Sequence, residues 1–165
     1  MPDAIQIDIK TTWRGAVAHL HLTSRASAPM QACETLQLVA GQGIVGDRYK
    51  DGVGFYSDKP EEGRQVTLFE LETLAALKRD HDIEFAPHEH RRNVTTSGVP
   101  LNHLVGRRIR IGATVLEATR LSTPCQHIVD VTGKKVFKPL INRSGLNCRI
   151  LTGGVIRVGD AIEPA

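Results

Sequence analysis

The sequence is poor in features that mark several large protein classes. It has three cysteines in 165 residues, too few for a disulfide scaffold, so we expect free thiols and a cytoplasmic protein. No apolar run approaches the ~20 residues that a membrane-spanning helix needs, and residues 1–10 lack the apolar core of a signal peptide. Only 4% of the residues are aromatic, too few for a base-stacking surface. We therefore expect neither a membrane nor a nucleic-acid partner.

What the sequence does have is the composition of a globular domain. Its 165 residues are 41% hydrophobic and 24% charged, which fits one domain over residues 1–165. The net charge of +3 is unevenly distributed, with −4 over residues 1–87 and +7 over residues 88–165. A basic half suits an anionic ligand, although each arginine can equally be a surface salt-bridge partner.

Short strand patterns dominate the chain. Apolar and polar residues alternate over 13–23, as in a half-buried strand. Apolar residues recur at helical spacing over 69–81, and short helical turns are predicted at 101–105 and 125–131. The pattern predicts a mainly β (β-rich α+β) fold, a small closed or partly closed β-barrel of mostly antiparallel strands with a few short helices. The other predicted strands are 34–40, 64–69, 90–96, 107–111, 114–119, 146–151, 154–158 and 161–163.

Residues 41–63 are rich in glycine and charged residues, and we predict a long loop there. The loop opens with GQGIVG at 41–46, which matches the G-x-G-x-x-G string of dinucleotide-binding sites. Such a site needs a helix that starts on the glycines, and the segment that follows cannot continue one. We therefore predict either a tight turn or a glycine loop that presents Asp47 and Arg48 to a ligand.

Two pairs of histidines have the spacing of neighbours on one face of a strand. They are His19 with His21, and His88 with His90. A zinc site needs three or four ligands, and no further ligand pair lies nearby in the sequence. We therefore interpret the first pair as strand packing and the second as a surface feature.

The three cysteines differ in context. Cys148 alternates with apolar residues and is interpreted as a core residue, while Cys33 precedes a strand and is ambiguous. Cys125 follows Pro124 at the start of a predicted short helix, whose dipole would favour the thiolate, as would nearby His127 and the basic segment downstream. A thiolate can be a nucleophile, a sulfur carrier or a soft metal ligand. From the residues alone, a reactive Cys125 and a buried, inert Cys125 are equally good interpretations.

A series of short motifs connects Cys125 to a known family. In chain order they are GIVGDR at 43–48, RQVTL at 64–68 with Glu70, RRNV at 91–94, G-x-x-L-x-x-L-x-G at 98–106, IG-x-x-VLE at 111–117, Pro124-Cys125, R-x-GL at 143–146 and G-x-I-x-x-GD at 154–160. The series resembles the MOSC domain, named for the C-terminal domain of molybdenum cofactor sulfurase. The resemblance covers about residues 13–163 and implies a single domain with a barrel-like core of mostly antiparallel strands.

The resemblance also implies that Cys125 is the functional cysteine. In one hypothesis, Cys125 carries sulfur as a persulfide. It receives the sulfur from a pyridoxal-phosphate-dependent cysteine desulfurase and passes it on for maturation of the molybdenum cofactor or a metal–sulfur cluster. In an alternative, the chain binds molybdenum cofactor with Cys125 as the molybdenum ligand, and reduces N-hydroxylated compounds with electrons from a redox partner. A third hypothesis is a non-catalytic module that binds a small anion.

The same resemblance points to further site residues. Molybdopterin carries a phosphate, which suits arginine because its planar fork can bind two oxygen atoms at once. In the sulfur-carrier hypothesis the same arginines would hold the thiolate or an anionic acceptor. The candidate arginines are Arg48, Arg64, Arg91, Arg92 and Arg143, and Asp47, Thr67 and Asn93 complete the predicted cofactor-binding set.

Three departures from the family bear on these hypotheses. Tyr49 stands where many relatives carry histidine, which leaves no imidazole at that position. The sequence shows no N-terminal β-barrel domain like that of the amidoxime-reducing members, which disfavours the reductase hypothesis. No lysine site for pyridoxal phosphate is identifiable, so we expect a separate protein to supply the sulfur.

Overall fold

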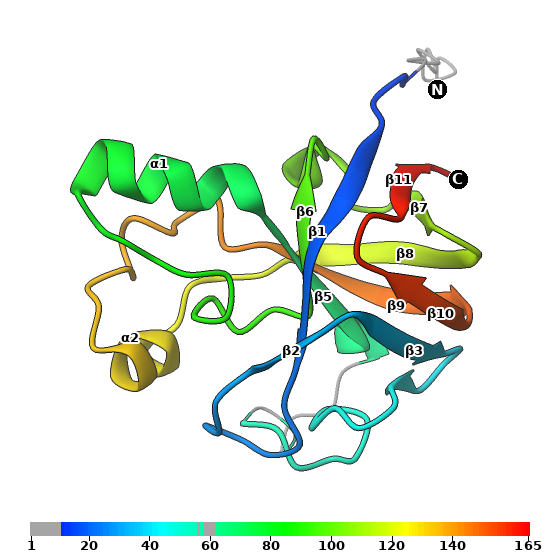
Figure 1. Cartoon of the computed structure of the whole chain (residues 1–165), viewed down its shortest axis with the longest axis horizontal. Coiled ribbons are helices and arrows are strands. Elements are labelled where there is room, and N and C mark those ends of the chain that lie inside the picture. Colours follow the sequence, from blue (N-terminus) through cyan, green and yellow to red (C-terminus); the bar gives the residue numbers. More distant parts are fainter. Residues whose placement is uncertain (1–10, 56, 58–61) are drawn as a thin grey trace, which may run out of the picture.

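The computed structural model describes residues 11–55, 57 and 62–165, and its centre is a closed β-barrel (Figure 1). Seven strands follow one another in the order β1-β11-β7-β8-β9-β5-β6, and β6 pairs with β1 to close the barrel. Neighbouring strands are antiparallel except β5 and β6. The prediction of a small, mostly antiparallel β-barrel is confirmed. The barrel strands are β1 (Gly15–Leu22), β5 (Val66–Glu70), β6 (Val94–Ser97), β7 (Arg108–Ile111), β8 (Thr114–Leu121), β9 (Leu146–Thr152) and β11 (Ala161–Pro164).

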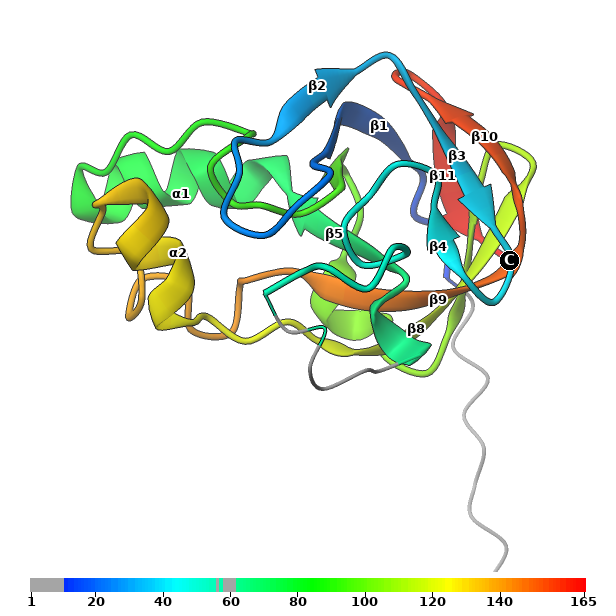
Figure 2. The same ribbon diagram turned by 90° about the horizontal axis from the view of Figure 1, so that it is seen from below.

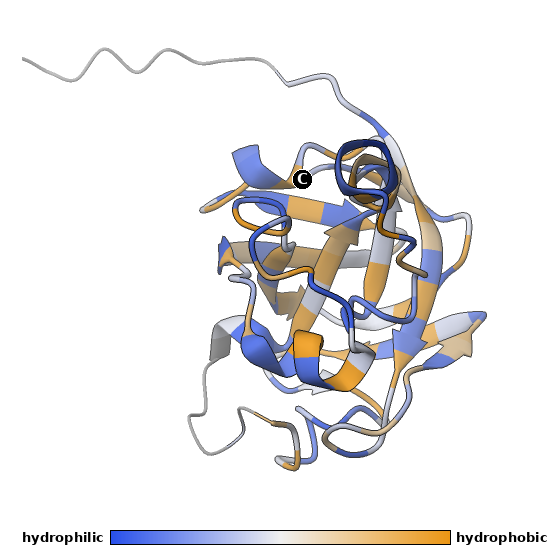
Figure 3. Ribbon diagram, turned by 90° about the vertical axis from the view of Figure 1, so that its left-hand side faces the viewer, coloured by the Kyte–Doolittle hydropathy of each residue, from blue (hydrophilic) through white to orange (hydrophobic). Residues whose placement is uncertain are grey.

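Alternating side chains give the barrel strands two different faces, visible as alternating colours in Figure 3. On β5, Leu68 pairs with Val94 of β6 on one side and with Leu146 of β9 on the other, and all three side chains are fully buried in the barrel core. The residues next to them, Thr67 and Asn147, also pair across β5 and β9. Because neighbouring residues of a strand point to opposite faces, this polar pair lies on the outside of the barrel wall.

Four further strands flank the barrel. Strand β2 (Gln31–Cys33) pairs with the end of β1, while β3 (Thr35–Val39), β4 (Gly43–Ile44) and β10 (Gly154–Arg157) form a separate sheet (Figure 2). The sequence did not predict β2 or β4, because two or three residues are too few to display a strand period. In the described residues after β4 the chain turns and does not start a helix, as expected for the glycine string.

Two helices lie together at one end of the barrel (Figures 1 and 2). Helix α1 (Leu71–His81) connects the parallel strands β5 and β6, which require such a crossover. Helix α2 (Gln126–Thr132) begins directly after Cys125. A second apolar core joins the two helices, and it contains Phe69, Leu77, Phe85, Ile128, Val136 and Leu140. Cys125 packs against this core, which fixes its position relative to the barrel.

Short helical turns and loops complete the described chain. The 3-10 turns are η1 (Glu62–Arg64) and η2 (Leu101–His103). The predicted loop 41–63 contains β4 and part of η1, and its residues 56 and 58–61 lie outside the described part of the chain. None of the helices in the described residues combines the length and apolar character needed to span a bilayer.

Candidate functional site

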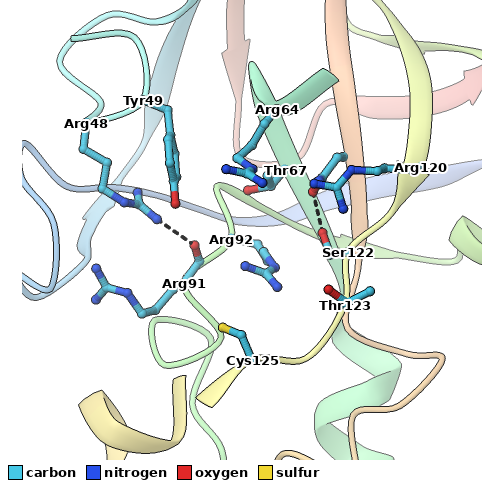
Figure 4. Close-up of a pocket in the computed structure, with 11 residues that line it drawn as sticks. Arg48, Tyr49, Arg64, Thr67, Arg91, Arg92, Arg120, Ser122, Thr123 and Cys125 are labelled. Carbon is cyan, nitrogen blue, oxygen red and sulfur yellow. Dashed lines mark hydrogen bonds between the residues drawn. The ribbon is translucent and has the colours of Figure 1, made fainter. Parts of the chain in front are cut away.

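A pocket of about 140 Å³ lies where the loop after β4, the end of β8 and the start of α2 meet (Figure 4). Among the described residues that line it, five are arginines and none is acidic. Cys125 is partly exposed and also lines it. The lining residues are Arg48, Tyr49, Arg64, Thr67, Arg91, Arg92, Arg120, Ser122, Thr123, Cys125 and Asn147. The fold thus brings six of the predicted site residues together: Arg48, Arg64, Thr67, Arg91, Arg92 and Cys125.

Polar residues of β5, β8 and β9 form one wall of the pocket, because the register of these strands places them side by side. Asn147 on β9 pairs with Thr67 on β5 and with Arg120 on β8, so three strands present one polar row. Ser122 Oγ donates a hydrogen bond to Asn147 Oδ1 at 2.5 Å and extends the row toward Cys125. Sequence reasoning missed Arg120, Ser122, Thr123 and Asn147. Arg120 and Asn147 could not be found because the pairing of β8 with β9 is not visible in the sequence. The position of Arg120 shortly before Pro124-Cys125 could, however, have indicated that it lies near the site.

Asp47 and Asn93 support the pocket from beneath without lining it. Asp47 Oδ1 accepts hydrogen bonds from Arg48 Nη1 at 3.1 Å and from Asn93 Nδ2 at 3.3 Å. Asn93 Oδ1 in turn accepts from Thr67 Oγ1 at 3.0 Å. Arg48 Nη2 donates to the main-chain oxygen of Arg91 at 3.3 Å, as Figure 4 shows. This network ties the loop after β4 to β5 and to the segment before β6.

Arg91 is a buried cation with an unused donor. Its side chain is 5% exposed, and its backbone has a left-handed φ of 64°. Nη1 donates to the main-chain oxygen of Ala28 at 2.8 Å, while Nη2 is buried and has no hydrogen-bond partner among the described residues. Burial, with repulsion from Arg48, lowers the pKa of Arg91 to about 10. A buried donor without a partner is costly, and Arg91 is one of the residues that line the pocket.

Tyr49 packs between two pocket arginines. The guanidinium carbon of Arg48 lies 4.6 Å from the centre of the Tyr49 ring, and that of Arg64 lies 5.5 Å from it. Cation–π attraction therefore orients both guanidinium groups. The loop passes so close to the ring that a Cβ on Gly54 would lie 2.5 Å from it, which requires glycine there. Tyr49 is thus an aromatic spacer between two cations.

Cys125 is the residue before α2, with an extended backbone (φ −139°, ψ 157°). The surroundings of His127 do not favour the positive charge that we expect from it beside Cys125. The His127 ring stacks on Phe55 with 3.8 Å between ring centres. Burial, together with Arg91 and Arg48, lowers the pKa of His127, which disfavours the charged imidazolium. Positive charge near Cys125 therefore comes from the arginines.

The other two thiols are in different environments. Cys148 is fully buried in the barrel core, as predicted, and burial raises its pKa well above the usual value. Cys33 lies in β2, and burial raises its pKa as well. Of the three cysteines in the sequence, Cys125 lines the pocket.

Arg143 lies outside the pocket. Its Nε donates to the main-chain oxygen of Pro139 at 2.7 Å, and its Nη1 lies 3.2 Å from Asp80 Oδ2 near the end of α1. The Asp80 carboxylate bonds to Arg79 and Arg143, and these bonds lower its pKa to about 2. In this structure Arg143 therefore tethers the segment before β9 to α1.

The histidine pairs do not form a metal site in the described part of the chain, where no group of three metal-ligating side chains occurs. The prediction that His90 lies at the surface is wrong. Its side chain is fully buried against Phe69, with 4.2 Å between ring centres. Its Nδ1 accepts a hydrogen bond from the Arg92 main-chain N–H at 2.9 Å, and its Nε2 lies 2.8 Å from Thr95 Oγ1. His90 therefore positions the backbone of a pocket arginine.

Comparisons with known proteins agree with this architecture. The family model for the MOSC domain matches residues 56–163. A comparison with curated proteins finds no match. Among solved structures, the YuaD protein of Bacillus subtilis superimposes with a TM-score of 0.76 at 18% identity, covering 92% of this chain and 97% of that one. YiiM of Geobacillus stearothermophilus gives 0.69 at 12% identity (92% and 75% covered), and YiiM of Escherichia coli gives 0.66 at 14% (94% and 70%). At these identities the likeness concerns the fold.

Proposed function

The chain belongs to the MOSC-domain family, and we propose that it carries sulfur as a persulfide on Cys125. The observation that supports this most strongly is the position of Cys125, a partly exposed thiol in a small pocket lined by five arginines. In this proposal a pyridoxal-phosphate-dependent cysteine desulfurase supplies the sulfur. The acceptor is a site of molybdenum-cofactor or metal–sulfur maturation.

The transfer needs neither an oxidant nor a reductant. The Cys125 thiolate attacks the outer sulfur of the persulfide on the donor cysteine, a new S–S bond forms, and the donor S–S bond breaks. The donor thiolate leaves with the bonding electron pair. Thiolate and persulfide are both anions, so nearby guanidinium groups stabilise each of them by charge attraction and hydrogen bonding. The pocket walls also limit access of other thiols to the stored sulfur.

Binding of the molybdenum cofactor is the second candidate, because the MOSC family is associated with that cofactor. The residue types fit in part. Arg48, Arg64, Arg91 and Arg92 suit a phosphate, and Cys125 suits molybdenum as a soft ligand. A bound molybdenum centre would supply redox chemistry, such as reduction of N-hydroxylated compounds. The pocket volume of about 140 Å³, however, is below the ~300 Å³ of sites that enclose a small organic ligand. The described pocket is small for that cofactor, which supports the sulfur-carrier proposal.

The test is the intact mass of the native protein after anaerobic incubation with a cysteine desulfurase and cysteine. We expect wild type to gain one sulfur atom that a reductant removes. Cys33→Ala should gain the same atom, and Cys125→Ala should gain none. A folded wild-type protein that gains no sulfur, or a Cys125→Ala variant that still gains it, would contradict the proposal.

Molybdenum analysis tests the second candidate on the same proteins. Stoichiometric molybdenum in protein from a cofactor-producing host, lost in Cys125→Ser, would favour cofactor binding over sulfur carriage. If neither sulfur nor molybdenum is bound, the hypothesis of a non-catalytic module for a small anion takes their place.

A further inference from the structure

The pocket beside Cys125 has the charge and the size of a site for a small oxyanion. Its volume of about 140 Å³ leaves room for a small anion and is below the ~300 Å³ of sites that enclose a drug-sized ligand. The described lining contains arginine, hydroxyl and amide side chains and no carboxylate. Asp47 lies beneath it and bonds to Arg48. A multiply charged anion fits this environment.

Arg91 gives independent evidence that the pocket is built for a ligand. The side chain is 5% exposed, and its Nη2 has no partner among the described residues although the atom is buried. Nη1 of the same group is held by the main-chain oxygen of Ala28, so the guanidinium is fixed in place. The positive potential also reaches α2, where Arg91 and Arg48 contribute to the lowered pKa of His127. A fixed cation among the lining residues attracts an oxyanion by its charge.

We propose that this pocket binds thiosulfate, so that Cys125 can take sulfur directly from a small oxyanion as well as from a protein. This inference rests on the proposed function, because it needs a persulfide on Cys125. The Cys125 thiolate attacks the outer sulfur of thiosulfate, and an S–S bond to Sγ forms. The sulfur–sulfur bond of thiosulfate breaks, and sulfite leaves with its electron pair. The total charge is unchanged, and no oxidant or reductant is consumed.

The arginines are what makes this reaction feasible. A thiolate and a dianion repel each other at bonding distance, and the repulsion is greatest when no counter-charge is near. Strand β8, the turn η1, the loop after β4 and the segment before β6 bring five guanidinium groups to one small space. They offset the repulsion during attack and stabilise the charge that develops on the leaving sulfite.

The experiment compares two sulfur donors on the same full-length protein. Wild type and Cys125→Ala are incubated anaerobically with thiosulfate, or with a cysteine desulfurase and cysteine, and intact mass is recorded. We expect both donors to add one sulfur to wild type and none to Cys125→Ala, with one sulfite released per sulfur taken from thiosulfate. Added cyanide should then remove the sulfur as thiocyanate, which gives a steady-state assay.

Arginine variants test where the oxyanion binds. Arg120→Met removes one partly exposed pocket guanidinium, and Arg157→Met removes an exposed one on β10 as a matched control. Loss of one charged hydrogen bond predicts a KM for thiosulfate raised about ten-fold or more in Arg120→Met. The control should keep the wild-type KM. Arg91→Lys, which keeps the charge but loses the planar fork, should also raise the KM.

The two proposals fail in different ways. Loading by the desulfurase but not by thiosulfate would overturn the thiosulfate inference and leave sulfur carriage intact. Loading by neither donor would overturn both. Loading by thiosulfate with the same KM in wild type, Arg120→Met and Arg91→Lys would overturn the assignment of the oxyanion site to these arginines.

Discussion

At the scale of single residues, the site depends on side chains that do not line the pocket. Asp47 is 1% exposed and receives hydrogen bonds from Arg48, Asn93 and the main-chain N–H of Tyr49. Removing one partner of a buried ion pair leaves the other charge uncompensated. Asp47 therefore acts as a positioning residue for Arg48 and, through Asn93, for Thr67.

Asp47→Ala should consequently lower the free energy of unfolding by about 3–5 kcal/mol, because Arg48 stays buried without its carboxylate. Asp51→Ala, four residues along the same loop and exposed, is the matched control and should change it by less than about 0.5 kcal/mol. Urea unfolding followed by circular dichroism measures both. Equal stability of the two variants would show that the Asp47 network contributes little.

His90 gives the fold a dependence on pH. Burial, with repulsion from Arg92 and neighbouring histidines, lowers its pKa well below the ordinary histidine value of 6.5. The unfolded chain takes up a proton near pH 6.5, whereas the folded chain takes it up only at lower pH. Stability is therefore complete above pH 6.5 and decreases as the pH falls below it. His21, whose pKa burial also lowers, acts in the same direction.

We expect the free energy of unfolding to fall between pH 6.5 and pH 5, with a slope of up to about 1.4 kcal/mol per pH unit from His90. His90→Asn can retain the acceptor for the Arg92 N–H and should show a shallower slope. His103→Gln, at an exposed position, serves as the control and should keep the wild-type slope. If the free energy of unfolding falls with the same slope in wild type and His90→Asn, His90 is not the source of the pH dependence.

At the scale of elements, the pocket depends on contact between a loop and a short helix. Phe55, in the loop after β4, stacks on His127 of α2, and the same loop carries Arg48 and Tyr49. The loop is further held by a hydrogen bond from the main-chain N–H of Val53 to the main-chain oxygen of Arg48 at 2.9 Å. The stack thus connects the loop that carries Arg48 to the helix that follows Cys125.

Phe55→Ala should loosen this link. An aromatic pair contributes about 0.5–1.5 kcal/mol beyond its buried area, so amide hydrogen exchange in the described loop 45–55 should speed up by about two- to ten-fold. Val53→Ala, which truncates another exposed apolar side chain of the loop, is the control. If both variants exchange at the wild-type rate, the stack does not hold the loop.

Elements also differ in how far the sequence predicts them. The barrel strands and α1 were predictable because the period of two or of 3.6 persists over several residues. Strands β2 and β4 are too short to show a period. Arg120 was missed because it reaches the pocket through its pairing with Asn147, which depends on register between distant strands. Arg143 was included on the family resemblance, yet its partner in the fold is Asp80.

At the scale of the whole molecule, the barrel is closed and the polar pocket lies on the outside of its wall. The inward residues of β5 and β9 fill the core, and the outward residues between them begin the site. The charge asymmetry of the sequence supports this arrangement, since Arg91, Arg92 and Arg120 come from the basic half and Arg48 and Arg64 from the acidic half. Sequence could indicate an anionic ligand. Composition alone could not indicate that the two halves meet around one thiol, and that expectation came from the family resemblance.

The most direct test of the account is the order in which the three cysteines react in the native protein. Limiting iodoacetamide is added, samples are quenched over time, and peptide masses give the rate at each position. We expect Cys125 to react first, Cys33 more slowly because burial raises its pKa, and Cys148 only after unfolding. Faster modification of Cys33 or Cys148 than of Cys125 would contradict the assignment of the pocket thiol as the reactive group.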